Sequence, residues 1–167
     1  ARLTFLKLVR KEWLPEEFVK ELLKKEVCAP LFLISLGVDV NLKETRFGGE
    51  MIHYIPDLEE LETSDPSKCP IEIIIYSNRD PSLAPPGKST VAIAAGLPYD
   101  YMNNWKTEKG QRGEAYRKLK EKVADQVIKT AGNVIPGLSE HIICKDIATP
   151  LTYERYTLNA KGSMMGW

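Results

Sequence analysis

The sequence predicts an α+β or α/β fold, in which a mixed sheet of about five strands is covered by helices. Three observations predict it: apolar runs of strand length, one long segment with helical periodicity, and connections rich in proline and glycine. The chain has 167 residues, of which 43% are hydrophobic and 28% charged, a composition typical of globular proteins. We expect one domain over residues 1–167.

The first predicted elements are a helix and a buried strand. Pro15 suits the first position of a helix, and Glu16 and Glu17 follow where the positive helix end favours acids. Residues 29–40 (APLFLISLGVDV) form an almost continuous apolar run, which predicts a central strand buried on both faces.

The middle of the chain predicts three further strands. They are residues 51–55 (MIHYI), 70–78 (PIEIIIYSN) and 89–97 (STVAIAAGL). Residues 57–62 between the first two predict a short acidic helix. Residues 79–88 contain three prolines and a glycine, which predict a rigid loop.

The last third predicts a long helix, a fifth strand and a final helix. Apolar residues recur every three or four positions over residues 107–131, and Gly132 ends the pattern. Residues 141–148 predict the strand, and Thr149-Pro150 predicts the start of a helix that reaches Tyr156. Acids and bases interleave along the long helix, which favours a solvated face over a basic docking patch.

Charge and cysteine content exclude several classes of protein. The 23 basic and 23 acidic residues cancel, which disfavours a nucleic-acid binder. Cys28, Cys69 and Cys144 are odd in number and far apart, so we expect reduced, buried thiols in a cytoplasmic protein. The longest apolar run has strand length, too short to span a bilayer.

The chain carries few signs of a catalytic or metal site. Its glycines do not form a phosphate-binding loop, and its serines lie in no nucleophile elbow. His53 and His141 each lack a second ligand at metal spacing, so we expect no metal. Tryptophans and methionines suit an apolar ligand site, but for Trp13 and Met51 we favour core packing.

The C-terminal residues 158–167 (LNAKGSMMGW) differ from the rest of the chain. Two glycines flank a Met-Met pair in a poor setting for regular structure, and such a backbone can approach a ligand closely. The candidate substrate-binding or flavin-proximal residues are Asn159, Gly162, Ser163, Met164, Met165, Gly166 and Trp167.

Three stretches together resemble one family. They are residues 13–42, with Leu-Pro-Glu-Glu and then Leu-Phe-Leu-Ile-Ser-Leu-Gly-Val-Asp, residues 76–87 (YSNRDPSLAPPG), and residues 136–167, with Pro-Gly-Leu, Ala-Thr-Pro-Leu-Thr-Tyr-Glu-Arg-Tyr and Gly-Ser-Met-Met-Gly-Trp. The family is the flavin-dependent carotenoid desaturases and isomerases with the related retinol saturases, the phytoene dehydrogenase-like oxidoreductases. The order and spacing fit across essentially the whole chain.

The resemblance implies the substrate-side domain of a longer flavin amine-oxidase-like oxidoreductase. Family members carry a Gly-rich dinucleotide motif before such a segment and a flavin segment after it, and neither motif is present here. The parent is then expected to bind FAD and to desaturate, isomerise or saturate a carotenoid, another polyene or an isoprenoid lipid. No catalytic residue of the family can be placed on these positions.

A flavin supplies the redox step itself, so the protein must orient the substrate and exclude water. We expect one sheet face, drawn from residues 29–40, 51–55 and 89–97, to line an apolar tunnel, with residues 162–167 near the flavin. The chain alone is expected to bind no flavin, to be inactive, and to self-associate through apolar surface that the parent covers. The resemblance alone implies peripheral membrane contact of the parent.

Two other functions fit the sequence. One is a non-enzymatic α+β module for ligand binding or dimerisation, and the other is a flavin amine oxidase.

Overall fold

The computed structural model describes residues 2–46 and 49–165 of the chain. Its centre is a five-stranded sheet with the order β2-β3-β4-β1-β5. The strands are β1 (Phe32–Val38), β2 (Met51–Tyr54), β3 (Ile71–Ile75), β4 (Ser89–Ala95) and β5 (Ile142–Ala148). The helices are α1 (Glu16–Lys24), α2 (Tyr76–Arg79), α3 (Tyr101–Lys106), α4 (Glu114–Gly132) and α5 (Pro150–Thr157).

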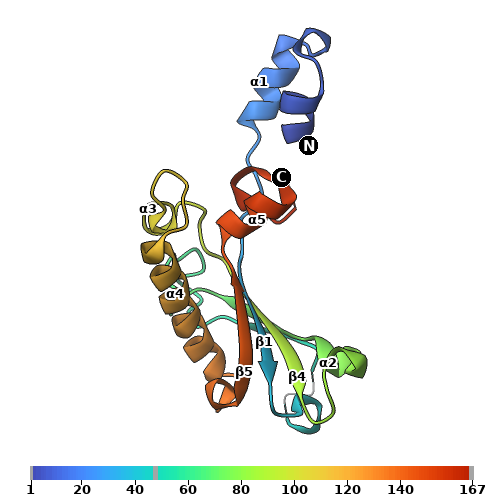
Figure 1. The fold of residues 1–167 in the computed structure, drawn as a ribbon, viewed down its shortest axis with the longest axis vertical. Helices are drawn as coiled ribbons and strands as arrows, with labels where there is room; N and C mark the ends of the chain where they lie inside the picture. The colour runs from blue at the N-terminus through green and yellow to red at the C-terminus, as the bar shows by residue number, and fades with distance from the viewer. Residues whose placement is uncertain (1, 47–48, 166–167) are drawn as a thin grey trace.

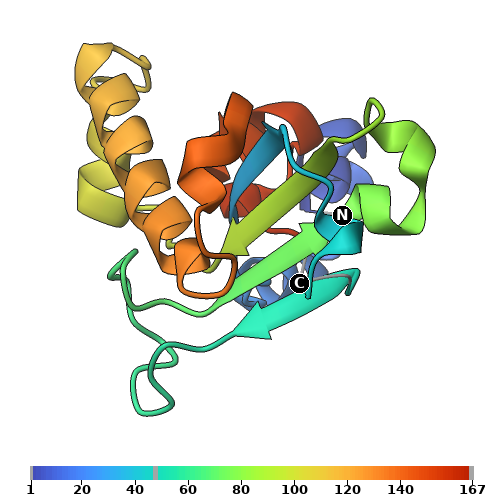
Figure 2. The ribbon, with the colours of Figure 1, turned by 90° about the horizontal axis from the view of Figure 1, so that it is seen from below.

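Helix α4 covers one face of this sheet. Every second residue of β1, from Phe32 to Val38, is buried on that face. On α4 the buried residues Leu119, Val123 and Val127 recur at helical spacing and belong to the same core cluster. Figure 1 shows α4 running along the sheet, and Figure 2 shows the short α2 on the other side from α4.

The α+β class and the five strands are confirmed, but the sheet is not mixed. All four pairings among the described strands are antiparallel. The chain passes from β4 through α3 and α4 to β5, which pairs with the far edge of β1 instead of with β4. Local sequence patterns indicate the length of a strand but not which strand it pairs with. The direction of pairing could therefore not be predicted from them.

Three local predictions were wrong. β1 is buried on one face only, because Ser35 on the other face is exposed and α4 covers a single side. Residues 57–62 form turns instead of a helix, since the Asp57 carboxylate accepts a hydrogen bond from the Glu59 amide at 2.9 Å. The long helix begins at Glu114 and not at residue 107.

The N-terminal segment forms a small helical arm. Residues 4–8 and 11–13 make two short turns before α1, and the Phe5 and Phe18 rings meet at 5.0 Å. Figure 1 shows α1 standing beyond the end of the sheet, next to α5. Trp13 in this arm is 68% exposed, and Met51 on the edge strand β2 is 52% exposed, so core packing is wrong for both. None of the described helices is long and apolar enough to cross a bilayer.

Candidate functional site

The C-terminal segment folds back onto the start of α5. Helix α5 ends where Leu158 adopts a left-handed conformation, and a short turn follows at Ala160–Gly162. Gly162 is buried with a φ of 61°, and a Cβ atom there would collide with the Pro150 carbonyl. Only glycine fits this position without strain, because both its dihedral angle and its close neighbour exclude a side chain.

The same segment is tied to the start of β1. Ser163 is buried and forms an antiparallel bridge with Pro30, and Asn159 Nδ2 donates a hydrogen bond to the Ser163 carbonyl at 3.0 Å. Asn159, Gly162 and Ser163 are therefore brought together, in a packed turn. Their contact with a ligand stays a prediction.

The remaining candidates lie at the end of the described chain. Met164 is 45% exposed and Met165 is 72% exposed, so both side chains are accessible. Gly166 and Trp167 lie outside the described residues. The expected proximity of these four residues to a flavin stays a prediction.

The side of the sheet away from α4, here called the second face, is built mainly from small residues at its centre. The strand register places Leu33 between Ala94 and Ala148, and Ser35 between Ala92 and Asp146. Ala92 and Ala94 are buried at the centre, whereas Ser35 and Asp146 are exposed. The second face consists of Leu33, Ser35, Gly37, Met51, His53, Glu72, Ile74, Thr90, Ala92, Ala94, Cys144, Asp146 and Ala148.

The three segments expected to share one face do lie in one sheet. β1 and β4 are neighbours, while β2 is separated from β4 by β3. The contributions of β3 and β5 to this face could not be predicted, because an antiparallel register cannot be derived from hydrophobic runs. Burial raises the pKa of Tyr153 in α5, with a smaller contribution from Tyr76 of α2.

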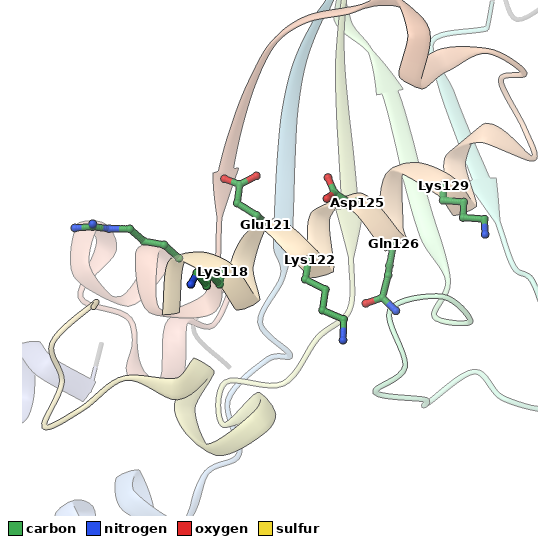
Figure 3. Close-up of a pocket in the computed structure, with 7 residues that line it drawn as sticks. Lys118, Glu121, Lys122, Asp125, Gln126 and Lys129 are labelled. Atoms are coloured by element: carbon green, nitrogen blue, oxygen red, sulfur yellow. The ribbon is translucent and has the colours of Figure 1, made fainter. Parts of the chain in front are cut away.

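The outer surface of α4 carries a shallow groove of about 620 Å³, shown in Figure 3. Glu121 and Asp125 point to one side of the helix, and Lys122 and Gln126 point to the other. Lys145 Nζ of β5 lies 2.9 Å from Glu121 Oε2 and 3.2 Å from Asp125 Oδ1, so one ammonium group forms ion pairs with both carboxylates. This interleaving of charges is typical of a solvated helix face.

Metal-binding groups are scattered in the described part of the chain. His141 pairs with Asp39 at 2.9 Å, and His53 lies 3.7 Å from Glu72. Within residues 2–46 and 49–165, no three side chains of His, Cys, Asp or Glu lie close enough together to hold a metal ion.

Comparison with known proteins identifies the family. No family model matches the chain. Prolycopene isomerase of Daucus carota is 32% identical over 166 residues, which cover 96% of this chain and 25% of that protein. The chain belongs to the phytoene dehydrogenase-like family of oxidoreductases. Pyridine nucleotide-disulfide oxidoreductase domain-containing protein 2 of Mus musculus is 27% identical, over 92% of this chain and 29% of that protein.

A reductase also matches this chain, over a shorter stretch. All-trans-retinol 13,14-reductase of Danio rerio is 28% identical over 82 residues, which cover 48% of this chain and 14% of that protein. The phytoene dehydrogenase-like chain thus spans about a quarter of the length of the curated relatives that it matches over most of its own length. These relatives are named as isomerases, reductases and oxidoreductases, which supports an enzyme as the parent.

The described residues of this phytoene dehydrogenase-like chain do not fit a dinucleotide by themselves. Nucleotide binding in a Rossmann unit needs a parallel βαβ pair whose first turn is rich in glycine. Here the turn after β4 (residues 96–100, GLPYD) has a single glycine and leads to α3, and the strands pair antiparallel. A flavin of this family would need residues beyond 2–46 and 49–165.

Proposed function

We propose that residues 1–167 form the substrate-side domain of an FAD-dependent oxidoreductase that desaturates, isomerises or saturates a carotenoid, another polyene or a related isoprenoid lipid. The observation that carries the proposal is the second face of the sheet. Helix α4 covers only the opposite face, and the centre of the second face is built from small side chains, because Ala92, Ala94 and Ala148 lie beside Leu33.

A long hydrocarbon is bound by apolar surface and shape, with few polar groups. Small side chains on a pleated sheet let a flat conjugated chain lie close to the backbone. Each square ångström of apolar surface removed from water contributes roughly 25 cal/mol. Polar residues of this face, such as Ser35 and Asp146, lie beside the alanines, where they favour one position of the hydrocarbon along the strand.

When FAD is bound, it supplies the hydride or electron chemistry. The chain's own residues hold the substrate against the flavin and exclude water. Met164 and Met165, exposed at the end of a fixed turn, suit the border between the apolar wall and the flavin domain. The same proposal includes a cytoplasmic parent with peripheral membrane contact, since the substrate dissolves in a bilayer.

The test compares two Ser→Phe variants of the full-length protein. Ser35 is exposed at the centre of the second face, and Ser139 is exposed in the turn before β5. Both accept a larger side chain without a clash in the core. We expect the full-length protein to be yellow and to bleach when a polyene is added without oxygen.

Ser35→Phe should lower kcat/KM for the polyene at least tenfold with flavin content unchanged. Ser139→Phe should have the same kcat/KM as the full-length protein without a substitution. Equal turnover by both variants would show that the second face is not the substrate wall. A colourless parent that binds the polyene would instead indicate a binding module.

A further inference from the structure

Two cavities lie where β4 ends, and they share part of their walls. The smaller, of about 740 Å³, is lined by Tyr99, Asn104, Arg112, Glu154 and Arg155 among others. The larger, of about 850 Å³, is also lined by Tyr99 and Asn104. The walls of the smaller cavity come from the segment after β4, from the loop before α4 and from α5, and the larger cavity adds Arg2 and residues 23–28.

Three cations of these walls form no ion pair, whereas Lys24 in the larger cavity is paired with Glu21 at 3.2 Å. Arg112, Arg155 and Lys161 form no ion pair with any carboxylate of the described residues. Arg112 is half-buried, donates a hydrogen bond to the Leu151 carbonyl and lies 5.6 Å from the Tyr116 ring. A cation held partly out of water without a counter-ion is unfavourable, so the arrangement favours an anion from outside.

Glu154 offsets only one of the two guanidinium charges of the smaller cavity. Its Oε2 accepts a hydrogen bond from the Tyr99 hydroxyl at 2.6 Å. Burial, and then Glu154, raise the pKa of Tyr99 to about 12, so Tyr99 remains a neutral phenol. The smaller cavity has two guanidinium groups against one carboxylate, in a chain whose net charge is zero.

The shared wall is fixed by the core. Residues 102–106 have φ between 47° and 62°, a left-handed turn that places Asn104 at both cavities. Trp105 in this turn is fully buried, stacks on Phe32 at 5.4 Å and donates its indole N–H to the Pro98 carbonyl at 3.3 Å. Such strain persists only where the surroundings hold it, and it is common at binding sites.

We propose that the smaller cavity binds an oxyanion, the carboxylate or phosphate group of a small organic molecule. The guanidinium groups of Arg112 and Arg155 form the charged contacts, and Asn104 donates from its amide. Lys161 adds positive charge across the shared wall. This site does not depend on a flavin or on an apolar substrate.

Isothermal titration calorimetry of the 167-residue chain tests it, with inorganic phosphate and acetate as probes at constant ionic strength in chloride. At least one probe should bind saturably and more tightly than chloride, and the tighter probe identifies the group. Arg155→Gln should weaken binding at least fivefold. Lys118→Gln, which removes a cation paired with Glu114 at 2.6 Å, should change nothing.

Arg155 decides the test because it is exposed, lies 5.5 Å from the Tyr156 ring and forms no ion pair with a carboxylate of the described residues. Its loss therefore leaves the fold intact, which circular dichroism checks. Arg112→Lys, which keeps the positive charge but not the paired N–H donors of the guanidinium, should weaken binding less than Arg112→Gln. Binding of neither probe above chloride, or equal affinities for Arg155→Gln and Lys118→Gln, would overturn the proposal and leave the proposed function standing.

Discussion

Replacing Gly162 by alanine tests whether the C-terminal turn holds α5 to the sheet. The change imposes a left-handed dihedral on a residue with a Cβ, which costs roughly 1–2 kcal/mol. It also drives that Cβ into the Pro150 carbonyl, and overpacking of this kind costs roughly 1–3 kcal/mol. The Gly162 position combines both penalties, since its φ is 61° and its neighbour is backbone that cannot rotate away.

The protein can relieve this strain with a smaller loss of stability. The turn can leave its place, at the loss of the bridge between Ser163 and Pro30 and of the hydrogen bond from Asn159 to the Ser163 carbonyl. Each such bond contributes about 1 kcal/mol net, so release of the segment limits the loss to about 2 kcal/mol. With an m-value of roughly 2 kcal/mol per molar urea, the unfolding midpoint should fall by about 1 M.

Gly87→Ala is the matched control. Gly87 also has a positive φ, of 77°, but a Cβ there meets nothing within 4 Å. It should cost only the dihedral penalty, about 1 kcal/mol. Urea unfolding followed by circular dichroism measures both variants, and hydrogen exchange should rise at residues 159–165 in Gly162→Ala alone. If Gly162→Ala is no less stable than Gly87→Ala, the collision is not present in solution and the reasoning fails.

Three further predictions concern the core, the half-buried Tyr99 phenol and the arm. Trp105→Ala should reduce the free energy of unfolding by about 3–5 kcal/mol in urea titrations, because a fully buried indole is removed; a loss below about 1 kcal/mol would contradict its place in the core. The pKa of Tyr99 is raised from 10.0 to about 12, so between these values the folded chain holds more protons than the unfolded chain and loses stability as pH rises. Tyr99→Phe should therefore lose less stability between pH 10 and 12 than the chain without the substitution. Urea midpoints that fall equally with pH in the two proteins would refute this. Leu8 and Trp13 are exposed in the arm, so the chain made alone should self-associate in analytical ultracentrifugation, and Trp13→Ser should reduce association; a monomer at all concentrations would contradict it.

Elements whose pattern is local were predictable from the sequence. β4 begins at Ser89 as expected, and α5 begins at Pro150 directly after Thr149. Thr149 does not cap α5 with its side chain, because its hydroxyl lies 3.0 Å from the Tyr116 hydroxyl. Helical periodicity also located α4, although its start was placed too early, because Glu108 and Gln111 close a turn in which Gly110 has a φ of 78°.

The candidate site was less predictable, for physical reasons. The glycine at 162 was recognised as permitting close approach, and the structure gives that approach to the chain's own Pro150. A sequence pattern cannot separate a glycine that meets a ligand from one that meets backbone. Tyr99 and Glu154 are 55 positions apart, and neither carries a motif, so only the fold brings their side chains to 2.6 Å.

Helix α5 links the two proposed sites. It continues from β5, whose Ala148 lies on the second face, and it presents Glu154 and Arg155 to the smaller cavity. The Gly162 turn and the Arg112 hydrogen bond to Leu151 hold the start of this helix, while the Tyr99 hydrogen bond to Glu154 holds its middle. Gly162→Ala should therefore leave the anion affinity within about twofold if those two hydrogen bonds position α5, even when residues 159–165 exchange freely. A large loss of affinity would instead mean that the turn and the cavity behave as one cooperative unit, in which case binding of the anion should protect residues 159–165 from exchange.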